Sequence, residues 1–432
     1  MAASTSSEAR NGGRPEATEL KPRLGRLRLV FFVSQLGWSV PGTASGTLLQ
    51  QLAAELDPRH KVAVYATAGT VGALAASIIA VTGGALSDRV HARLGTRAPL
   101  ILGGALVATL AFAGTAVVHS PAGLIAAAAL YQVGLGVMLG SVSALLPEYV
   151  RSEMLGRVSA AMGVGVLLGQ VLGGVSGGLL VTNVRTGFLI LPWPLLISAL
   201  MVLGLLRGLR TSHAPGATPE PDEAATSGAP EADAVTVRGP WWRIGDATFW
   251  WIFIARALFI LGLYMATQYL LFTLTDHLHL SSARAGQILS ISSVLFAVTS
   301  TVFILVSGSL SDRLKRRKPF VAGGSLLVTV GSVPMLLHPS VIRIFAFVVL
   351  GGAAFGAYIA VDQALMVDAL PTAGNNARDL GILGAATSLP GAFAPAAAGL
   401  AVTSVGYSGL FAVVAVIEIL GAVCLLGVRR LK

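Results

Sequence analysis

Long apolar runs separated by short polar segments dominate the chain. The runs lie at about 29–50, 62–86, 99–118, 122–146, 157–181 and 188–206, and then at 249–274, 285–310, 319–337, 341–367, 380–403 and 407–427. At 1.5 Å per residue, a run of ~20 residues crosses the ~30 Å hydrocarbon layer of a bilayer. The ~10-residue alternating segments of a membrane β-barrel do not occur. The pattern therefore predicts an all-α membrane protein with twelve transmembrane helices.

Two polar stretches divide this pattern into domains. Residues 1–28 are rich in Ser, Gly, Glu and Arg, and residues 207–247 are rich in Pro, Ala and acids. We expect the first to be a disordered cytoplasmic tail and the second a flexible cytoplasmic linker. The tail has no apolar core, so we expect no cleaved signal peptide. The linker then separates two six-helix halves, 29–206 and 248–432.

Composition supports a membrane protein and argues against several other classes. The chain is 54% hydrophobic and only 12% charged, whereas soluble domains carry about 25% charged residues. Its net charge of +10 resides in short loops beside apolar runs, so we expect no nucleic-acid partner. The single Cys424 excludes an internal disulfide and a cysteine metal site. With no phosphate-binding loop pattern and no metal cluster, we expect neither an enzyme nor a cofactor.

The loops carry a strongly asymmetric charge. If the amino terminus is cytoplasmic, 24 Lys and Arg residues lie on that side and five on the other. Membrane proteins keep such residues in cytoplasmic loops. We therefore expect both termini in the cytoplasm of a multi-pass protein of the cell (cytoplasmic) membrane.

A charged loop motif occurs once in each half. Gly-x-Leu-Ser-Asp-Arg spans 84–89 and recurs at 308–313, so that Asp88 and Asp312 are 224 positions apart. The segment 136–148 likewise aligns with 356–368. An even number of spans gives both copies the same orientation. We therefore expect an axis along the membrane normal to relate the halves, with a solute path between them near the midplane.

These motifs resemble those of the major facilitator superfamily over residues 29–427. The loop signature between helices 2 and 3 is matched by Gly84, Leu86, Asp88, Arg89, Gly95 and Arg97, although extra residues before Gly95 make the loop more similar to sugar porters. The helix-5 signature of the drug/proton antiporters is matched by Gly165, Gly169, Gly173 and Gly174, with Gln170 in place of proline. The resemblance implies alternating-access transport. Its two branch signals point to different solutes.

The repeated loops are candidates for a cytoplasmic gate. The resemblance implies that Asp88 caps the amino end of helix 11 and that Asp312 does the same at helix 5, which would close the cytoplasmic side. The alternative for Asp88 is a solvated ion pair with neighbouring arginines. The remaining gate candidates are Gly84, Arg89, Arg97, Arg313, Glu148, Arg157 and Asp368.

Three ionisable residues lie inside the predicted spans. Arg256 in helix 7 and Asp362 in helix 10 are at similar depth, and a charge inside a membrane needs a partner. We expect them to pair, the alternative being an Arg256 that reaches the headgroups. Glu418 in helix 12 could carry a proton, but the resemblance places helix 12 outside the cavity. Asp362 is therefore the better proton site.

Polar and aromatic residues at helical spacing are candidates for the cavity wall. Phe355 and Tyr358 share a stripe of helix 10 with Asp362, and Gln35 and Trp38 share a face of helix 1. Trp38 could also be an interfacial anchor. Helix 7 adds Tyr264 and Gln268. Gln170 should face protein, where it contacts either solute or another helix.

The sequence favours a secondary active transporter that acts by alternating access, with proton-coupled efflux of a small organic solute. Proton-coupled sugar uptake is one alternative. A membrane sensor with a transporter fold is another, in which the linker binds a partner. For the transporter we expect a solute, protons and the lipid bilayer as partners, and a functional monomer.

Overall fold

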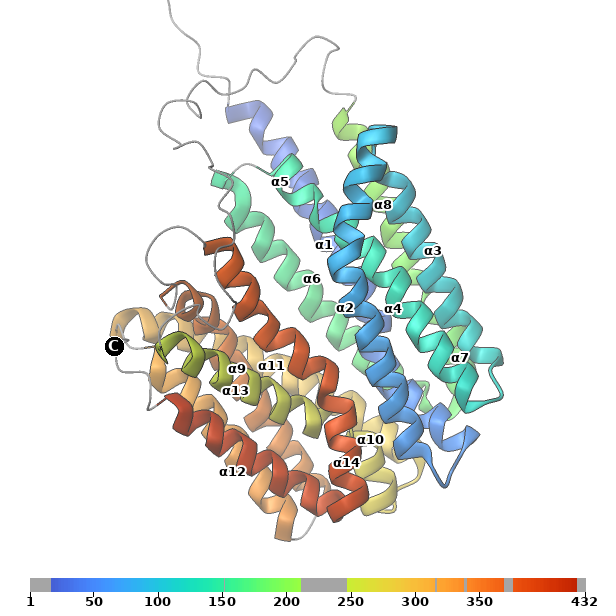
Figure 1. Ribbon diagram of the computed structural model, residues 1–432, viewed down its shortest axis with the longest axis vertical. Helices are drawn as coiled ribbons and strands as arrows, with labels where there is room; N and C mark the ends of the chain where they lie inside the picture. Colours follow the sequence, from blue (N-terminus) through green and yellow to red (C-terminus); the bar gives the residue numbers. More distant parts are fainter. Residues whose placement is uncertain are drawn as a thin grey trace, which may run out of the picture.

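The structure is a computed structural model that describes residues 17–150, 152–210, 247–314, 317–337, 340–368 and 376–425. Within these ranges all regular secondary structure is helical (Figure 1). The first group of α-helices comprises α1 (Ala17–Leu56), α2 (Lys61–Leu94), α3 (Ala98–Gly114), α4 (Pro121–Ser143), α5 (Leu145–Tyr149), α6 (Ser152–Leu179), α7 (Val184–Ile190) and α8 (Trp193–Arg210). The second comprises α9 (Ala247–Thr267), α10 (Leu270–Phe272), α11 (Ser282–Leu314), α12 (Lys318–Leu337), α13 (Val341–Asp368) and α14 (Asn376–Cys424).

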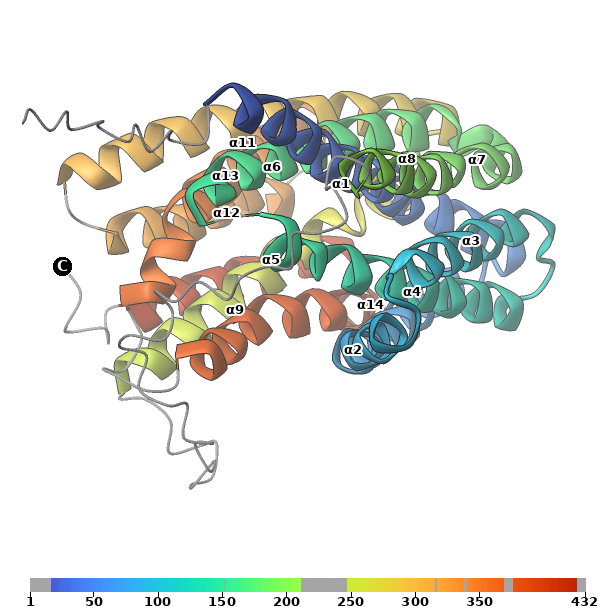
Figure 2. The same cartoon turned by 90° about the horizontal axis from the view of Figure 1, so that it is seen from above.

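Each group packs into a bundle of its own, called here the first half (α1–α8) and the second half (α9–α14). In the first half α1 packs on α6 and α2 on α4, and in the second half α9 packs on α14 and α11 on α13. The halves meet along two pairs of helices, α6 with α11 and α2 with α14, which lie side by side in both views (Figures 1 and 2). The functional site lies between these two seams.

Ten stretches of the described residues are long and apolar enough to cross a membrane. They do not include α1, and they count α14 once, although Gly406 interrupts α14 with a φ of 74°. Glycine adopts this left-handed conformation without a Cβ penalty. The predicted runs 380–403 and 407–427 therefore correspond to two helices that meet at Gly406 and form the two arms of α14. The count of twelve stays a prediction.

The predicted boundary segments fall mainly outside the described residues. The helix α1 begins at Ala17, inside the predicted tail of 1–28, and α8 runs to Arg210, inside the predicted linker of 207–247. Residues 1–16 and 211–246 lie outside the part that the structure describes.

Glycines fasten α6 to its neighbours on two faces. A Cβ at Gly165 would lie 2.5 Å from the carbonyl oxygen of Phe32 in α1, and side chains at Gly169 and Gly173 would also collide with α1. On another face, side chains at Gly174 and Gly178 would collide with α11. Small residues let membrane helices approach this closely. Helix packing thus accounts for the glycine pattern that resembles the antiporters.

The halves are joined toward one end of the molecule. We call it the Asp276 end, and we call the opposite end the Asp88 end. Near the Asp276 end, Ser290 of α11 donates to the carbonyl oxygen of Val175 at 3.0 Å. A Cβ at Gly69 would lie 2.8 Å from Pro395 of α14. Toward the Asp88 end the two bundles splay apart (Figure 1).

Candidate functional site: a cavity between the halves

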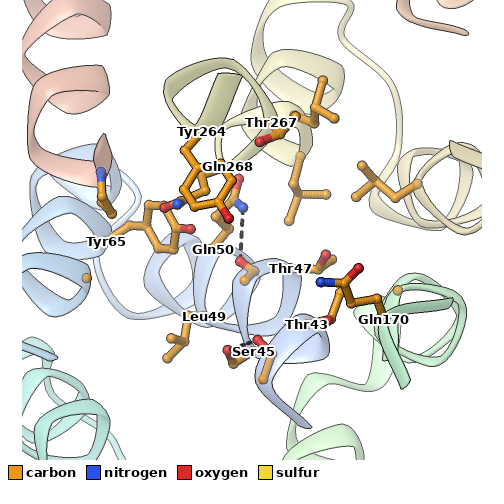
Figure 3. Close-up of a pocket in the computed structure, with 18 of the residues that line it drawn as sticks. Thr43, Ser45, Thr47, Leu49, Gln50, Tyr65, Gln170, Tyr264, Thr267 and Gln268 are labelled. Carbon is orange, nitrogen blue, oxygen red and sulfur yellow. Dashed lines mark hydrogen bonds between the residues drawn. The ribbon is translucent and has the colours of Figure 1, made fainter. Parts of the chain in front are cut away.

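A cavity of about 520 Å³ lies between the two halves. Its wall is built mainly from α1, α2, α4 and α6 of the first half and from α9, α11, α13 and α14 of the second, with further residues from α3, α7 and α10. Glycine and alanine on α2 and α4 leave room for it, and longer polar side chains project toward the space (Figure 3). The hydrogen-bonding side chains of the wall are Thr43, Ser45, Thr47, Gln50, Tyr65, Thr115, Tyr131, Gln132, Gln170, Tyr264, Thr267, Gln268, Ser292 and Ser293.

The described wall of this cavity combines apolar surface with hydrogen-bonding side chains and carries no charged side chain. None of its lining residues is Asp, Glu, Lys, Arg or His. It offers amides, hydroxyls and aromatic faces instead. Tyr131 Oη and Ser292 Oγ are buried without a hydrogen-bond partner among the described residues, and both belong to the wall. Buried polar atoms usually have partners, so these two groups are unpaired hydrogen-bonding groups of the wall.

The structure places four of the seven predicted cavity residues on the wall, namely Gln170, Tyr264, Gln268 and Phe355. The other three lie elsewhere. Trp38 donates its Nε1 hydrogen to Gln35 Oε1 at 2.6 Å, which pairs the two polar groups with each other. Tyr358 is 2% exposed and stacks on Phe259 at 4.4 Å between ring centroids. Neither Gln35, Trp38 nor Tyr358 lines the described cavity.

Several wall residues were not anticipated from the sequence. Gln50 is 3% exposed and binds the carbonyl oxygen of Gly46 at 2.9 Å. Tyr65, Tyr131 and Gln132 also line the cavity. The signal was weak for Tyr131 and Gln132, because only apolar residues and glycines stand three and four positions from each of them.

A network across the halves closes the Asp276 end. Lys61 Nζ lies 2.6 Å from Asp276 Oδ1, and Tyr407 donates its hydroxyl hydrogen to Asp276 Oδ2. The backbone N–H of Phe272 donates to Gln50 Oε1 at 3.4 Å. The Tyr65 ring packs edge-on against Phe272, with the centroids 5.9 Å apart. These contacts join the halves at the Asp276 end, where Gln50 and Tyr65 also line the cavity.

At the opposite end, Asp88 pairs within its own half. Its Oδ1 lies 2.9 Å from Arg97 Nη1, which also donates to Ser87 Oγ at 2.7 Å. Arg97 Nε donates to Glu148 at 3.3 Å. The Asp88 side chain is 71% exposed, in keeping with the splayed halves. An inter-half cap by Asp88 stays a prediction for a state closed at this end.

The remaining gate candidates divide into two groups. Gly84 and Arg89 lie in α2, Arg157 in α6 and Arg313 in α11, and the three arginines are exposed. The side chains of Asp312 and Asp368 lie outside the described part of the structure.

Arg256 and Asp362 meet inside the second half. Arg256 Nη1 lies 2.9 Å from Asp362 Oδ1, and the two side chains are only 8% and 6% exposed. Arg256 Nε donates to Thr387 Oγ1 of α14 at 2.9 Å. The pair thus joins α9, α13 and α14, and neither residue belongs to the cavity wall.

Glu418 lies in the second arm of α14 and is 0% exposed. Neither of its carboxylate oxygens has a hydrogen-bond partner among the described residues. Its carboxyl packs against Gly262 of α9, where a Cβ would lie 2.6 Å from Oε1.

The described residues contain no group of three or more His, Cys, Asp or Glu that could hold a metal ion.

Several solved transporters share this fold. A bacterial homologue of the human lysosomal transporter Spinster, inward-facing and occupied, is similar with a TM-score of 0.66 and 15% identity over 98% of each chain. A D-xylose–proton symporter has a TM-score of 0.67 and 15% identity, over 93% of this chain and 97% of its own. A POT family transporter in complex with a thioalcohol-conjugated peptide has a TM-score of 0.68 and 14% identity, over 93% and 95%.

The family itself is shown at the level of sequence. A search of curated proteins gives no match. The sequence profile of the Major Facilitator Superfamily, however, matches residues 27–302 and 252–432, which is most of the chain. Two helical halves around a central cavity agree with that match. The chain is a multi-pass membrane protein that belongs to the major facilitator superfamily, a family of secondary transporters.

Proposed function

We propose that this transporter moves a small, neutral organic solute rich in hydrogen-bonding groups. The observation that carries the proposal is the uncharged described wall of the cavity, with its amides of Gln50, Gln132, Gln170 and Gln268. A charged solute would lose its hydration there without gaining a counter-charge, which is costly. A solute with several hydroxyls would instead pair with the amides and with Tyr131 and Ser292. This chemistry favours a sugar or polyol over an apolar drug.

Three compounds that share one sugar ring test this specificity. Purified protein is heated with glucose, which is neutral, with glucosamine, which carries an ammonium group at C2, or with glucuronate, which carries a carboxylate at C6. We expect only the neutral sugar to raise the melting temperature, because a ligand that binds the folded state stabilises it by mass action. Equal stabilisation by a charged member of the set would contradict the proposal.

We further propose that protons drive transport through Asp362. Its carboxylate is held by Arg256 at 2.9 Å within the membrane-spanning bundle, and intramembrane acids commonly mark proton relays. Protonation of Asp362 would release Arg256 and loosen the contacts among α9, α13 and α14. In reconstituted vesicles, Asp362→Asn should abolish solute movement driven by a pH gradient and keep solute exchange at equal pH. Unchanged pH-driven movement would remove Asp362 from the mechanism.

The expected topology indicates to which side of the membrane the cavity is open in the observed conformation. The positive-inside pattern assigns the Asp88 end to the cytoplasm, and we therefore propose that this conformation is open to the cytoplasm of the cell membrane. An inside-acid gradient imposed on loaded, right-side-out vesicles separates the two modes. Sugar–proton symport should release sugar, whereas proton exchange for efflux should retain it.

We propose that the linker is dispensable for transport. Deleting residues 212–236 tests the sensor alternative, because a transporter should tolerate the deletion and a sensor that binds a partner through this segment should not. We also propose that the monomer suffices, since the cavity is bounded by helices of one chain.

A further inference from the structure

The carboxyl of Glu418 is buried in a place where, among the described residues, no positively charged side chain lies against it. Its side chain is 0% exposed, and neither oxygen has a hydrogen-bond partner among the described residues. The polar groups near it are the hydroxyl of Ser325 on α12 and the backbone of Leu263 on α9. Neither carries a charge. A bare carboxylate here would be very costly, and such groups take up a proton instead.

The charged groups on the surrounding helices are already engaged or distant. On α9 the cation is Arg256, which binds Asp362 and Thr387. On α12 it is Lys318, the first residue of the helix and about two turns from Ser325. Tyr264 on α9 faces the cavity, and Tyr358 on α13 stacks on Phe259. On its own arm of α14 the titratable groups are Tyr407, bound to Asp276, and Cys424.

Glu418 packs against α9, a helix that also contributes to the cavity wall. Its Oε1 would lie 2.6 Å from a Cβ at Gly262, so the carboxyl rests on the backbone of α9. Tyr264 lies two positions further on and is turned by about 200° around the helix axis. It therefore faces the opposite way and lines the cavity. The helix α9 is thus held between the carboxyl and the solute space.

We propose that Glu418 is a proton-binding site, separate from the Arg256–Asp362 pair, and that its proton governs the position of α9. With the proton bound, the carboxyl is neutral and the close contact at Gly262 is stable. After release of the proton to water, the carboxylate needs solvent or a counter-charge, so α9 and the second arm of α14 move apart. A solute that shifts α9 then changes the proton affinity, and the coupling is reciprocal.

Proton binding is independent of the proposed function, whereas its effect on transport rests on that function. Infrared difference spectroscopy of the purified full chain at neutral pH tests the first step. We expect a carbonyl stretching band from a protonated carboxyl that is lost in Glu418→Gln. The matched control is Glu55→Gln, which changes an exposed acid and should keep the band. A band of equal intensity in wild type and Glu418→Gln overturns the proposal.

Glu418→Asp guards against a variant that fails to fold. It keeps a protonatable group but draws it back from Gly262, so the band should persist and shift in frequency. The second step is tested by spin labels on exposed positions of α2 and α11 near the Asp88 end. Their separation should change with pH in wild type, and in Glu418→Gln only the part of that change that depends on Asp362 should remain. The same pH response in both proteins overturns control of α9 by Glu418, even if the infrared result holds.

Discussion

The two halves repeat one architecture but differ in the charge that they bury. The described part of the first half buries Ser, Thr and Gln side chains and no ionised type, whereas the second half buries Arg256, Asp362 and Glu418. The repeat that pairs 136–148 with 356–368 aligns Asp362 with Val142, which is 2% exposed. Both halves line the cavity, whose described wall is uncharged, whereas the buried charge of the described residues belongs to one half.

Breaking the buried ion pair should have the largest effect on stability. Arg256→Met leaves Asp362 without its partner, and removing one member of a buried pair costs about 3–5 kcal/mol. We expect a marked fall in the melting temperature in detergent. Replacing both residues, as in Arg256→Met with Asp362→Leu, should recover much of the loss because no lone charge remains.

The matched control is Arg59→Met, which changes an exposed arginine of the first half. Exposed substitutions of this kind stay within about 0.5 kcal/mol. Equal losses from Arg256→Met and Arg59→Met would contradict the contrast between the halves.

A larger side chain where α6 packs against α11 should have the next largest effect on stability. Gly178 of α6 lies against the Gly286 backbone, where a side chain would collide, whereas Gly163 on the same helix has open space around it. Overpacking costs about 1–3 kcal/mol. We expect Gly178→Val to lower the free energy of unfolding by that amount, which is seen as a lower melting temperature. Gly163→Val should leave the melting temperature unchanged. The reverse order would show that the halves are not joined through this glycine.

Removing the ion pair between the halves should have a smaller effect on conformation. Lys61 and Asp276 are 23% and 21% exposed, so water weakens their attraction. Lys61→Met should shift the balance toward a state open at the Asp276 end by about 1 kcal/mol, roughly fivefold in population. Cysteine labelling of cavity positions from the Asp276 end, which is outside the cell in the proposed topology, measures this change. An unchanged labelling rate would mean that Tyr407 and the aromatic packing suffice.

Neutralising Asp88 should have the smallest effect on stability. Its pair with Arg97 is largely exposed, and such pairs contribute little. Asp88→Asn should therefore change the free energy of unfolding by less than about 0.5 kcal/mol. Transport should nevertheless slow if Asp88 caps a helix of the second half in the other state. A large loss of stability would place Asp88 among the structural groups instead.

The sequence predicted those features that depend only on a residue's position along the membrane normal. Span positions follow from apolar length, and Arg256 and Asp362 meet because two oppositely directed helices brought them to one depth. The cavity depends on how helices are rotated against each other. Gln35 and Trp38 were placed on the right helix, yet they bind one another. Gln50 was not predicted because its partner Phe272 belongs to the other half, and the two meet only through the packing of the halves at the Asp276 end.

The bend at Gly406 has a mechanical consequence. The arm before it carries Pro395 and Gly399, which rest on α2 of the first half, and the arm after it carries Glu418. A loop between two helices absorbs displacement, but here the chain turns at one glycine with a φ of 74°. Gly406 therefore connects the helix at the seam directly to the helix that carries the buried acid, and a change in its two torsions alters the angle between them.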